Sequence, residues 1–170
     1  TFGSSGKTIT DYNSRENKIY DMALQSDGKI VAVGFTNNGA TDNNFTVVRY
    51  TTSGSIDTTF GSSGFAIFEL NSSGNTADAA RAVAIQSNGK IVAGGFYNNG
   101  SNHATILRLH ENGNIDNSFS TDGIVSITDV SEVLAIAIGN DGTIYAGGFY
   151  GSLIHDTCVM HINSDGSFDD

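Results

Sequence analysis

Short runs of apolar residues alternate with Asp-Gly and Asn-Gly dipeptides along the whole chain. The phrase AVAIQSNGKIVAGGF occupies residues 82–96, and two near copies, DMALQSDGKIVAVGF and AIAIGNDGTIYAGGF, occupy residues 21–35 and 135–149. Each phrase places two runs of Val, Ile, Leu and Ala around a dipeptide that supplies the positive φ angles of a tight type I′ turn. The pattern therefore predicts three β-hairpins.

The hairpins belong to a longer repeat that covers the chain. Phe2 and Phe60 lie in identical Thr-Phe-Gly sequences, and Phe119 takes the same place in Ser-Phe-Ser. The spacing of these phenylalanines is close to 60 residues in both intervals. We expect a single repeat array over residues 1–170, with approximate repeats 2–59, 60–118 and 119–170.

The apolar runs of one repeat predict four strands. In the second repeat these strands lie roughly over residues 65–70, 81–86, 90–96 and 105–110. The last strand carries apolar residues on both faces, so we expect small sheets stacked face to face. A four-stranded unit of this size cannot bury its own faces and must stack on its neighbours. The prediction is an all-β fold, a β-propeller-type array of three four-stranded antiparallel blades.

The order of motifs resembles a known repeat family. The pattern A-x-A-x-Q-x-N-G-K-I-V-A-x-G begins at Ala82, and R-x-x-x-x-G-x-I-D-x-x-F runs from Arg108 to Phe119. It is similar to the delta-60 repeat of bacterial surface and secreted proteins, and more distantly to NHL-type propeller blades. The resemblance implies an often extracellular propeller module with no established chemistry. The third copy departs from the pattern, with Gly139, Thr143 and His161 in place of Gln, Lys and Arg.

Composition and net charge limit the classes of partner that the chain is expected to bind. The formal net charge is −10 and the acidic residues are scattered, which opposes binding to nucleic acid or to an anionic membrane. No apolar run reaches the length of a membrane span. The single cysteine, Cys158, excludes an intrachain disulfide framework.

Two patterns in the sequence resemble metal sites. In a strand, His155 and His161 would lie about 20 Å apart with Cys158 facing the other way, which disfavours zinc. The segment Asn163–Asp169 resembles a cation loop but lacks the full EF-hand pattern. Asx-type turns account more simply for the aspartates that the repeats share, Asp57, Asp116 and Asp169. We expect no cofactor, and calcium stays open as the alternative.

Sequence motifs of catalysis are missing. The Gly-Ser-Ser-Gly phrases are one residue too short for a nucleophile elbow, and no phosphate loop or carboxylate pair is present. Arg49, Arg108 and His161 share one repeat position, where we expect them to bridge blades through carbonyls or acidic neighbours. We therefore expect no catalytic residue and no enzyme activity.

Polar loops follow the hairpins, and in these loops the three repeats differ in sequence. We place candidate ligand contacts in these loops, at Asn37, Asn38, Tyr97, Asn98, Asn99 and Tyr150. Asparagine combines donors with acceptors and aromatic rings offer flat faces, which suits a glycan. The alternative is that these segments are turns and that the preceding phenylalanines pack between blades.

The sequence favours a non-enzymatic structural or adhesive module of a bacterial cell-surface or secreted protein. A glycan-binding, lectin-like propeller is the alternative. The ends are in phase, because Asp169-Asp170 followed by Thr1-Phe2 would resemble residues 57–60. We therefore expect head-to-tail self-association or continuation in a longer chain, with a six-bladed ring from two copies as the simplest closed form, and a glycan or protein as a further partner.

Overall fold

A computed structural model describes residues 1–39, 42–71, 77–151 and 156–169. Within these ranges every regular element is a β-strand, and no helix that could cross a membrane is found there. The strands are β1 (Asn17–Leu24), β2 (Ile30–Asn37), β3 (Asn43–Tyr50), β4 (Phe65–Phe68), β5 (Ala79–Ile85), β6 (Ile91–Asn98), β7 (Asn102–Leu109), β8 (Ile124–Ile127), β9 (Val130–Ile138), β10 (Ile144–Tyr150) and β11 (Asp156–Ile162).

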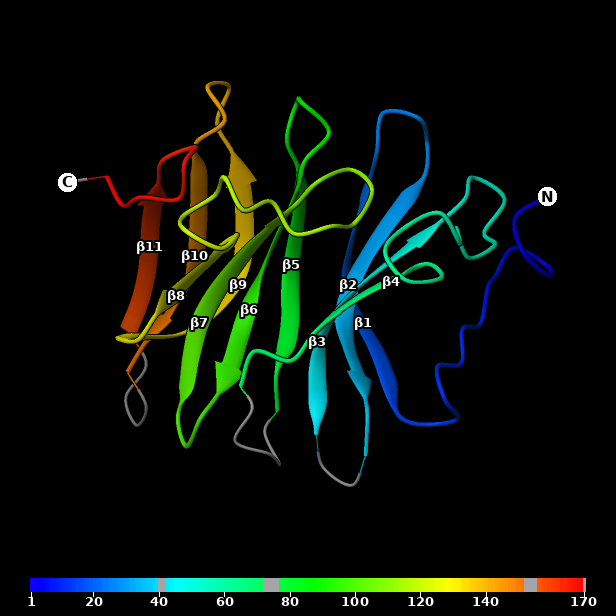
Figure 1. Cartoon of the computed structure of the whole chain (residues 1–170), viewed down its shortest axis with the longest axis horizontal. Coiled ribbons are helices and arrows are strands. Elements are labelled where there is room, and N and C mark those ends of the chain that lie inside the picture. Colours follow the sequence, from blue (N-terminus) through cyan, green and yellow to red (C-terminus); the bar gives the residue numbers. More distant parts are fainter. Residues whose placement is uncertain (40–41, 72–76, 152–155, 170) are drawn as a thin grey trace.

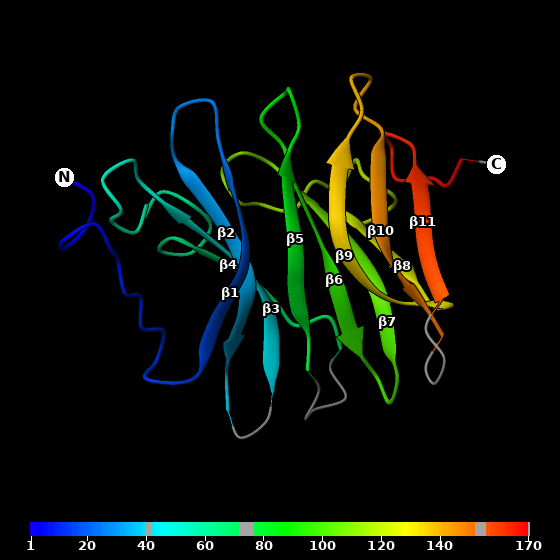
Figure 2. The same cartoon turned by 180° about the vertical axis from the view of Figure 1, so that it is seen from behind.

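The strands form three antiparallel sheets that stand side by side in chain order (Figure 1, Figure 2). Blade 1 has the order β1-β2-β3-β4, blade 2 has β5-β6-β7-β8, and blade 3 has β9-β10-β11. The predicted all-β, propeller-type array is confirmed. The third blade differs from the expectation because its described part holds three strands instead of four.

The sheets are offset from the sequence repeats by one strand. The predicted strand at 65–70 forms as β4, but it pairs with β3 of the preceding repeat, with Val47 opposite Ala66. In the same way β8 pairs with β7, with Ile106 opposite Val125. Each outer strand therefore comes from the beginning of the next sequence repeat. The grouping of strands expected from the sequence is corrected accordingly.

The core lies between the blades. Val33 and Phe45 of blade 1 pack with Leu107 of blade 2 in one cluster, and Ile106 of blade 2 packs with Val133 of blade 3 in another. All five side chains are fully buried. Neighbouring residues on β7 thus face opposite clusters, which confirms that this strand is covered on both sides.

Candidate functional site on the inner strands

The innermost strand of each blade contains a β-bulge at the same repeat position. In blade 2, Ala80 pairs with Gly95 and Ala82 pairs with Gly94, so Arg81 is the extra residue. The equivalent extra residues are Tyr20 in blade 1 and Leu134 in blade 3. A bulge locally bends the strand and re-aims the side chain of its extra residue.

Glycine opposite the bulge allows the two backbones to approach. A Cβ atom on Gly34 would lie 1.8 Å from the carbonyl oxygen of Lys18, and one on Gly95 would lie 1.9 Å from that of Ala79. A side chain at either position would collide with the main chain. Both glycines therefore mark a close approach of two backbones, and this approach is located at the bulge.

The bulge of blade 2 presents an arginine to both neighbouring blades. The Arg81 Nε donates a hydrogen bond to the Glu132 carboxylate of β9, and the Arg81 guanidinium lies 4.0 Å from the centre of the Tyr20 ring of β1. Glu132 is buried, whereas the Arg81 and Tyr20 side chains remain partly exposed. We call Tyr20, Arg81 and Glu132 the inner-strand cluster.

The cluster lies where the three blades converge. Strands β1, β5 and β9 stand at one edge of their sheets, and β5 contacts both β1 and β9. In a propeller this inner edge faces the central axis, where ligand sites form between blades. The three residues thus occupy the position at which a propeller brings side chains from different repeats together.

Arg81 carries a stable positive charge. Burial by itself lowers its pKa, but the hydrogen bond and the charge of Glu132 outweigh burial and raise the pKa above the ordinary value. A guanidinium has five N–H donors, and the bond to Glu132 engages Nε. The remaining donors can bind an oxygen-rich ligand, with the Tyr20 ring as an adjacent flat surface.

Arg49 and Arg108, which share one repeat position, stabilise the fold. Arg49 Nε donates to Asp57 over 2.9 Å, and its Nη1 donates to the Glu111 carbonyl of the second repeat over 2.5 Å. Arg108 likewise donates to Asp116 over 2.6 Å and to the Ser164 carbonyl. The expected bridging role of these arginines is confirmed, and they are not part of the candidate site.

The carboxylates of these pairs are held in their charged form. The hydrogen bond from the Thr59 hydroxyl is the main cause that lowers the Asp57 pKa from 3.8 to about 2, with a smaller contribution from the Arg49 charge. Burial tends to raise the pKa of Asp116, but hydrogen bonds from Lys90, Ser118 and Arg108 lower it well below the ordinary value. Backbone N–H groups two residues on also bond to both carboxylates, which confirms the Asx-type turns at Asp57 and Asp116. Asp169 bonds instead to the His161 imidazole.

The predicted loop residues lie at the ends of the second strands, along the lower edge of the array in Figure 1. The Asn37 amide donates to Asn43 over 3.0 Å, and the Asn98 amide donates to Asn102 over 2.6 Å. The Asn99 side chain contacts His103, and Tyr97 packs 5.2 Å from the same imidazole ring. Asn38 and Tyr150 are exposed. Each of these hydrogen bonds stays within one loop, so a shared site of these residues stays a prediction.

The metal alternatives gain no support from the described part of the chain. No group of three His, Cys, Asp or Glu residues there could hold an ion. His155 lies outside the described residues, and His161 bonds instead to Asp169 over 2.8 Å. In the 163–169 segment, the Asp165 carboxylate accepts hydrogen bonds from the backbone and hydroxyl of Ser167.

None of the three residues of the inner-strand cluster was predicted from the sequence. Two signals could have found it: a charged residue inside the apolar run Ala79–Ile85, and a glycine at the same place in each second strand. Glu132 has no such signal, because its contact with Arg81 joins residues 51 positions apart.

A family model described as "Domain of unknown function (DUF5122) beta-propeller" matches residues 25–60 and 86–119. The chain is an array of β-propeller repeats. A solved structure of a gluconolactonase from Xanthomonas campestris is similar over 98% of this chain, with a TM-score of 0.53 and 14% sequence identity. The chain spans about half of that structure, 52% of its length. Among curated proteins there is no significant match.

These findings correct the functional expectation. We predicted a non-enzymatic module, either structural and adhesive or glycan-binding, but the similar solved structure is that of an enzyme. At this identity the likeness shows a shared fold. The physical reason is that a site between blades would take one residue from each of several repeats and would leave no compact motif, so the lack of such a motif does not exclude an enzyme.

Proposed function

We propose that the chain forms half of a propeller hydrolase that acts on a small neutral ester of the sugar-lactone class. The observation that carries the proposal is the placement of Arg81 on the inner edge of the array, fixed by Glu132 and flanked by Tyr20. The similarity to a gluconolactonase supports the choice of substrate class. The coverage of about half of that enzyme supports the view that further blades complete the site.

The chemistry of lactone hydrolysis suits this arrangement. Water adds to the carbonyl carbon, negative charge develops on the carbonyl oxygen, and the ring C–O bond then breaks. The ring oxygen takes up a proton, so that lactone and water yield a hydroxy acid. The N–H donors of Arg81 can stabilise the developing charge, while Glu132 holds the guanidinium in one orientation.

Charge favours a neutral substrate. The chain carries a formal net charge of −10, which repels anions over the distance of a Debye length. A neutral polyol lactone can approach without this penalty, and its acidic product is repelled after the reaction. We therefore expect turnover of the lactone and weak binding of the acid.

The test is to measure the rate of acid release from glucono-1,5-lactone by pH-stat titration. This rate is compared with the spontaneous hydrolysis rate in buffer. We expect Arg81→Gln to lower kcat/KM by about 100-fold, as for the loss of one oxyanion donor. Arg15→Gln, which changes an exposed arginine, is the matched control with unchanged activity. A wild-type rate equal to that of buffer, or equal rates for the two variants, would contradict the proposal.

We also infer that the array is of the delta-60 type and works outside the cell or at its surface. The support is the motif order, which recurs around Arg49 and Arg108, and the resemblance to repeats of secreted proteins. Fractionation of the native bacterium with an antibody to this chain tests the location. Recovery in the cytoplasmic fraction alone would refute it.

A further inference from the structure

Asp21 lies beside the inner-strand cluster and connects two blades. It follows Tyr20 on β1, and its Oδ1 accepts a hydrogen bond from the Met22 N–H of the same strand over 2.8 Å. Its Oδ2 accepts a hydrogen bond from the Val83 N–H of β5 over 2.9 Å. One N–H from each of two blades thus fixes the carboxylate between blades 1 and 2, in the same gap across which Tyr20 meets Arg81.

The register of the hairpins explains why these two N–H groups are available. At the turn of blade 2, the Gln86 N–H donates to the Lys90 carbonyl, and hydrogen-bonded and non-hydrogen-bonded pairs then alternate along β5 and β6. Val83 falls in a non-hydrogen-bonded pair, so its N–H points away from β6 and toward the inner edge. Met22 has the same place in blade 1. The Asp21 carboxylate therefore lies at the inner edge of the array.

The repeat itself does not require a carboxylate at this position. The equivalent residues of blades 2 and 3 are Ala82 and Ala135, and both follow a bulge as Asp21 does. These two blades form the same hairpin with alanine there. The Asp21 side chain is half-buried, and none of the described Lys, Arg and His residues forms an ion pair with it. Its charge is thus uncompensated, and both oxygens retain capacity to accept hydrogen bonds.

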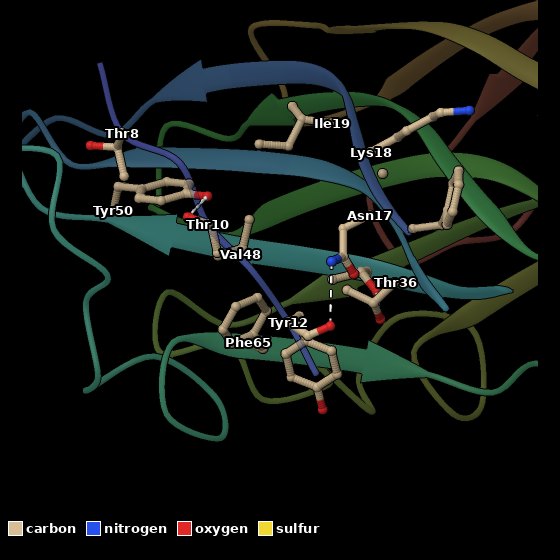
Figure 3. A pocket seen from close by; sticks show the side chains of 13 residues that line it. Thr8, Thr10, Tyr12, Asn17, Lys18, Ile19, Thr36, Val48, Tyr50 and Phe65 are labelled. Atoms are coloured by element: carbon tan, nitrogen blue, oxygen red, sulfur yellow. Dashed lines mark hydrogen bonds between the residues drawn. The ribbon is translucent and has the colours of Figure 1, made fainter. Parts of the chain in front are cut away.

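The pocket in Figure 3 is separate from this carboxylate. It lies on the face of blade 1 that turns away from blade 2, where Ile19 and Val48 line it. Val47, the neighbour of Val48 on β3, packs on the opposite face against blade 2. Asp21 bonds to Val83 of blade 2, so its carboxylate serves the inner edge and not this pocket.

Donor and acceptor groups are combined on one inner edge. The guanidinium of Arg81 donates hydrogen bonds and accepts none, whereas the carboxylate of Asp21 accepts them and cannot donate. Tyr20 precedes Asp21 in the chain and holds its ring 4.0 Å from the Arg81 guanidinium, so the three groups lie in one region. A polyol lactone matches this arrangement, because it offers a carbonyl oxygen to Arg81 and hydroxyl donors to Asp21. A lactone without hydroxyl groups offers only the carbonyl.

We propose that Asp21 is the residue that selects polyhydroxylated lactones over plain alkyl lactones. The assignment rests on the proposed hydrolase function and adds the group that binds the substrate hydroxyls. Because two backbone N–H groups already orient the carboxylate, it accepts a hydroxyl hydrogen bond without first having to be ordered. A substrate without hydroxyls displaces water from this charged acceptor and leaves it without a partner, which lowers kcat/KM for that substrate.

Two lactones test this role. Glucono-1,5-lactone carries hydroxyl groups, and δ-valerolactone has the same ring without them. We expect Asp21→Ala to lower kcat/KM for glucono-1,5-lactone by about 10- to 100-fold, as for the loss of a hydrogen bond to a charged group. The kcat/KM for δ-valerolactone should stay unchanged. Both rates are measured by pH-stat titration on one protein sample, so the second substrate reports whether the variant is correctly folded.

Asp27→Ala is the matched control. Asp27 belongs to the turn of the same blade and also accepts a backbone N–H, from Lys29 over 3.0 Å, but it is exposed and lies outside the inner edge. We expect this variant to hydrolyse both lactones at the wild-type rates. Asp21→Asn keeps one carbonyl acceptor, and for this variant we expect an intermediate loss on glucono-1,5-lactone.

The possible failures give different results. Equal losses on the two lactones in Asp21→Ala, no loss on either, or a wild type that prefers δ-valerolactone would overturn the assignment of Asp21 while the hydrolase proposal stands. A wild type that hydrolyses neither lactone faster than buffer would refute the hydrolase proposal and this assignment with it.

Discussion

At the scale of single residues, buried Arg–Asp pairs connect the successive repeats. Each arginine binds an aspartate of its own repeat and a carbonyl of the next, as Arg49 binds Asp57 and Glu111. The guanidinium also lies 4.8 Å from the centre of the buried Phe60 ring. One side chain thus fixes a turn, a strand and the adjoining blade, and its charge is compensated where it is buried.

The Asp57 pair makes stability depend on pH. The folded-state pKa of about 2 lies below the ordinary 3.8, so the stabilisation is complete above about pH 4 and is lost as the pH falls toward 2. We expect the free energy of unfolding of wild type to fall more steeply from pH 4 to pH 2 than that of Asp57→Asn. Urea unfolding at pH 4, 3 and 2 measures this, and parallel losses in the two proteins would refute it.

Sequence reasoning succeeded for Arg49 and Arg108 and failed for Arg81. The first two recur at one repeat position with an aspartate at a constant distance, so their role follows from the pattern. Arg81 corresponds to Tyr20 and Leu134 in the other blades, and three different residues at one position conceal a shared geometry. Its partners come from other blades, so only the fold brings them together.

At the scale of elements, the inner-strand bulges are the features that distinguish these blades from regular hairpins. The positions of the hairpin turns and the approximate extents of β5 and β6 were predictable from Asn-Gly and the apolar runs around it. The predicted type I′ geometry was wrong, because only the glycine of each dipeptide has a positive φ, as at Gly89. The bulges were not predictable from the sequence, because an extra residue in a strand becomes visible only as a shift in strand pairing. The strand glycines were the one visible trace of them.

We expect Gly95→Ala to destabilise the protein by about 2 kcal/mol, because the added Cβ would overlap the Ala79 carbonyl and force the bulge open. Gly39→Ala is the matched control, since an added Cβ there has no atom within 4 Å. Urea unfolding of both variants gives the difference. Equal stabilities would show that the bulge can relax without cost.

At the scale of the whole molecule, strand glycines set how closely neighbouring blades pack. Gly94 faces blade 3 so closely that an added Cβ would lie 2.7 Å from Val133. Gly147 is the equivalent residue of blade 3, and an added Cβ there meets only Ala135, at 3.9 Å. Within one chain this position is unconstrained.

The propeller architecture was predictable from repetition alone, because three copies of a four-strand pattern cannot bury themselves singly. The assignment of the outer strands to particular blades was not predictable from the sequence. The sequence places residues 65–70 next to the hairpin that follows, whereas β4 pairs with the strand that precedes it. A period in sequence fixes the length of a repeat, but it leaves open where one blade ends and the next begins.

This one-strand offset bears on how such arrays change length. A genetic duplication of one complete repeat would add three strands of a new blade and the outer strand of its neighbour in a single event. Every junction formed afterwards would reuse the Phe turn and Arg–Asp pair already present, as at Phe60 with Arg49 and at Phe119 with Arg108. Repeat number can therefore vary by recombination without any new contact having to evolve at the point of insertion.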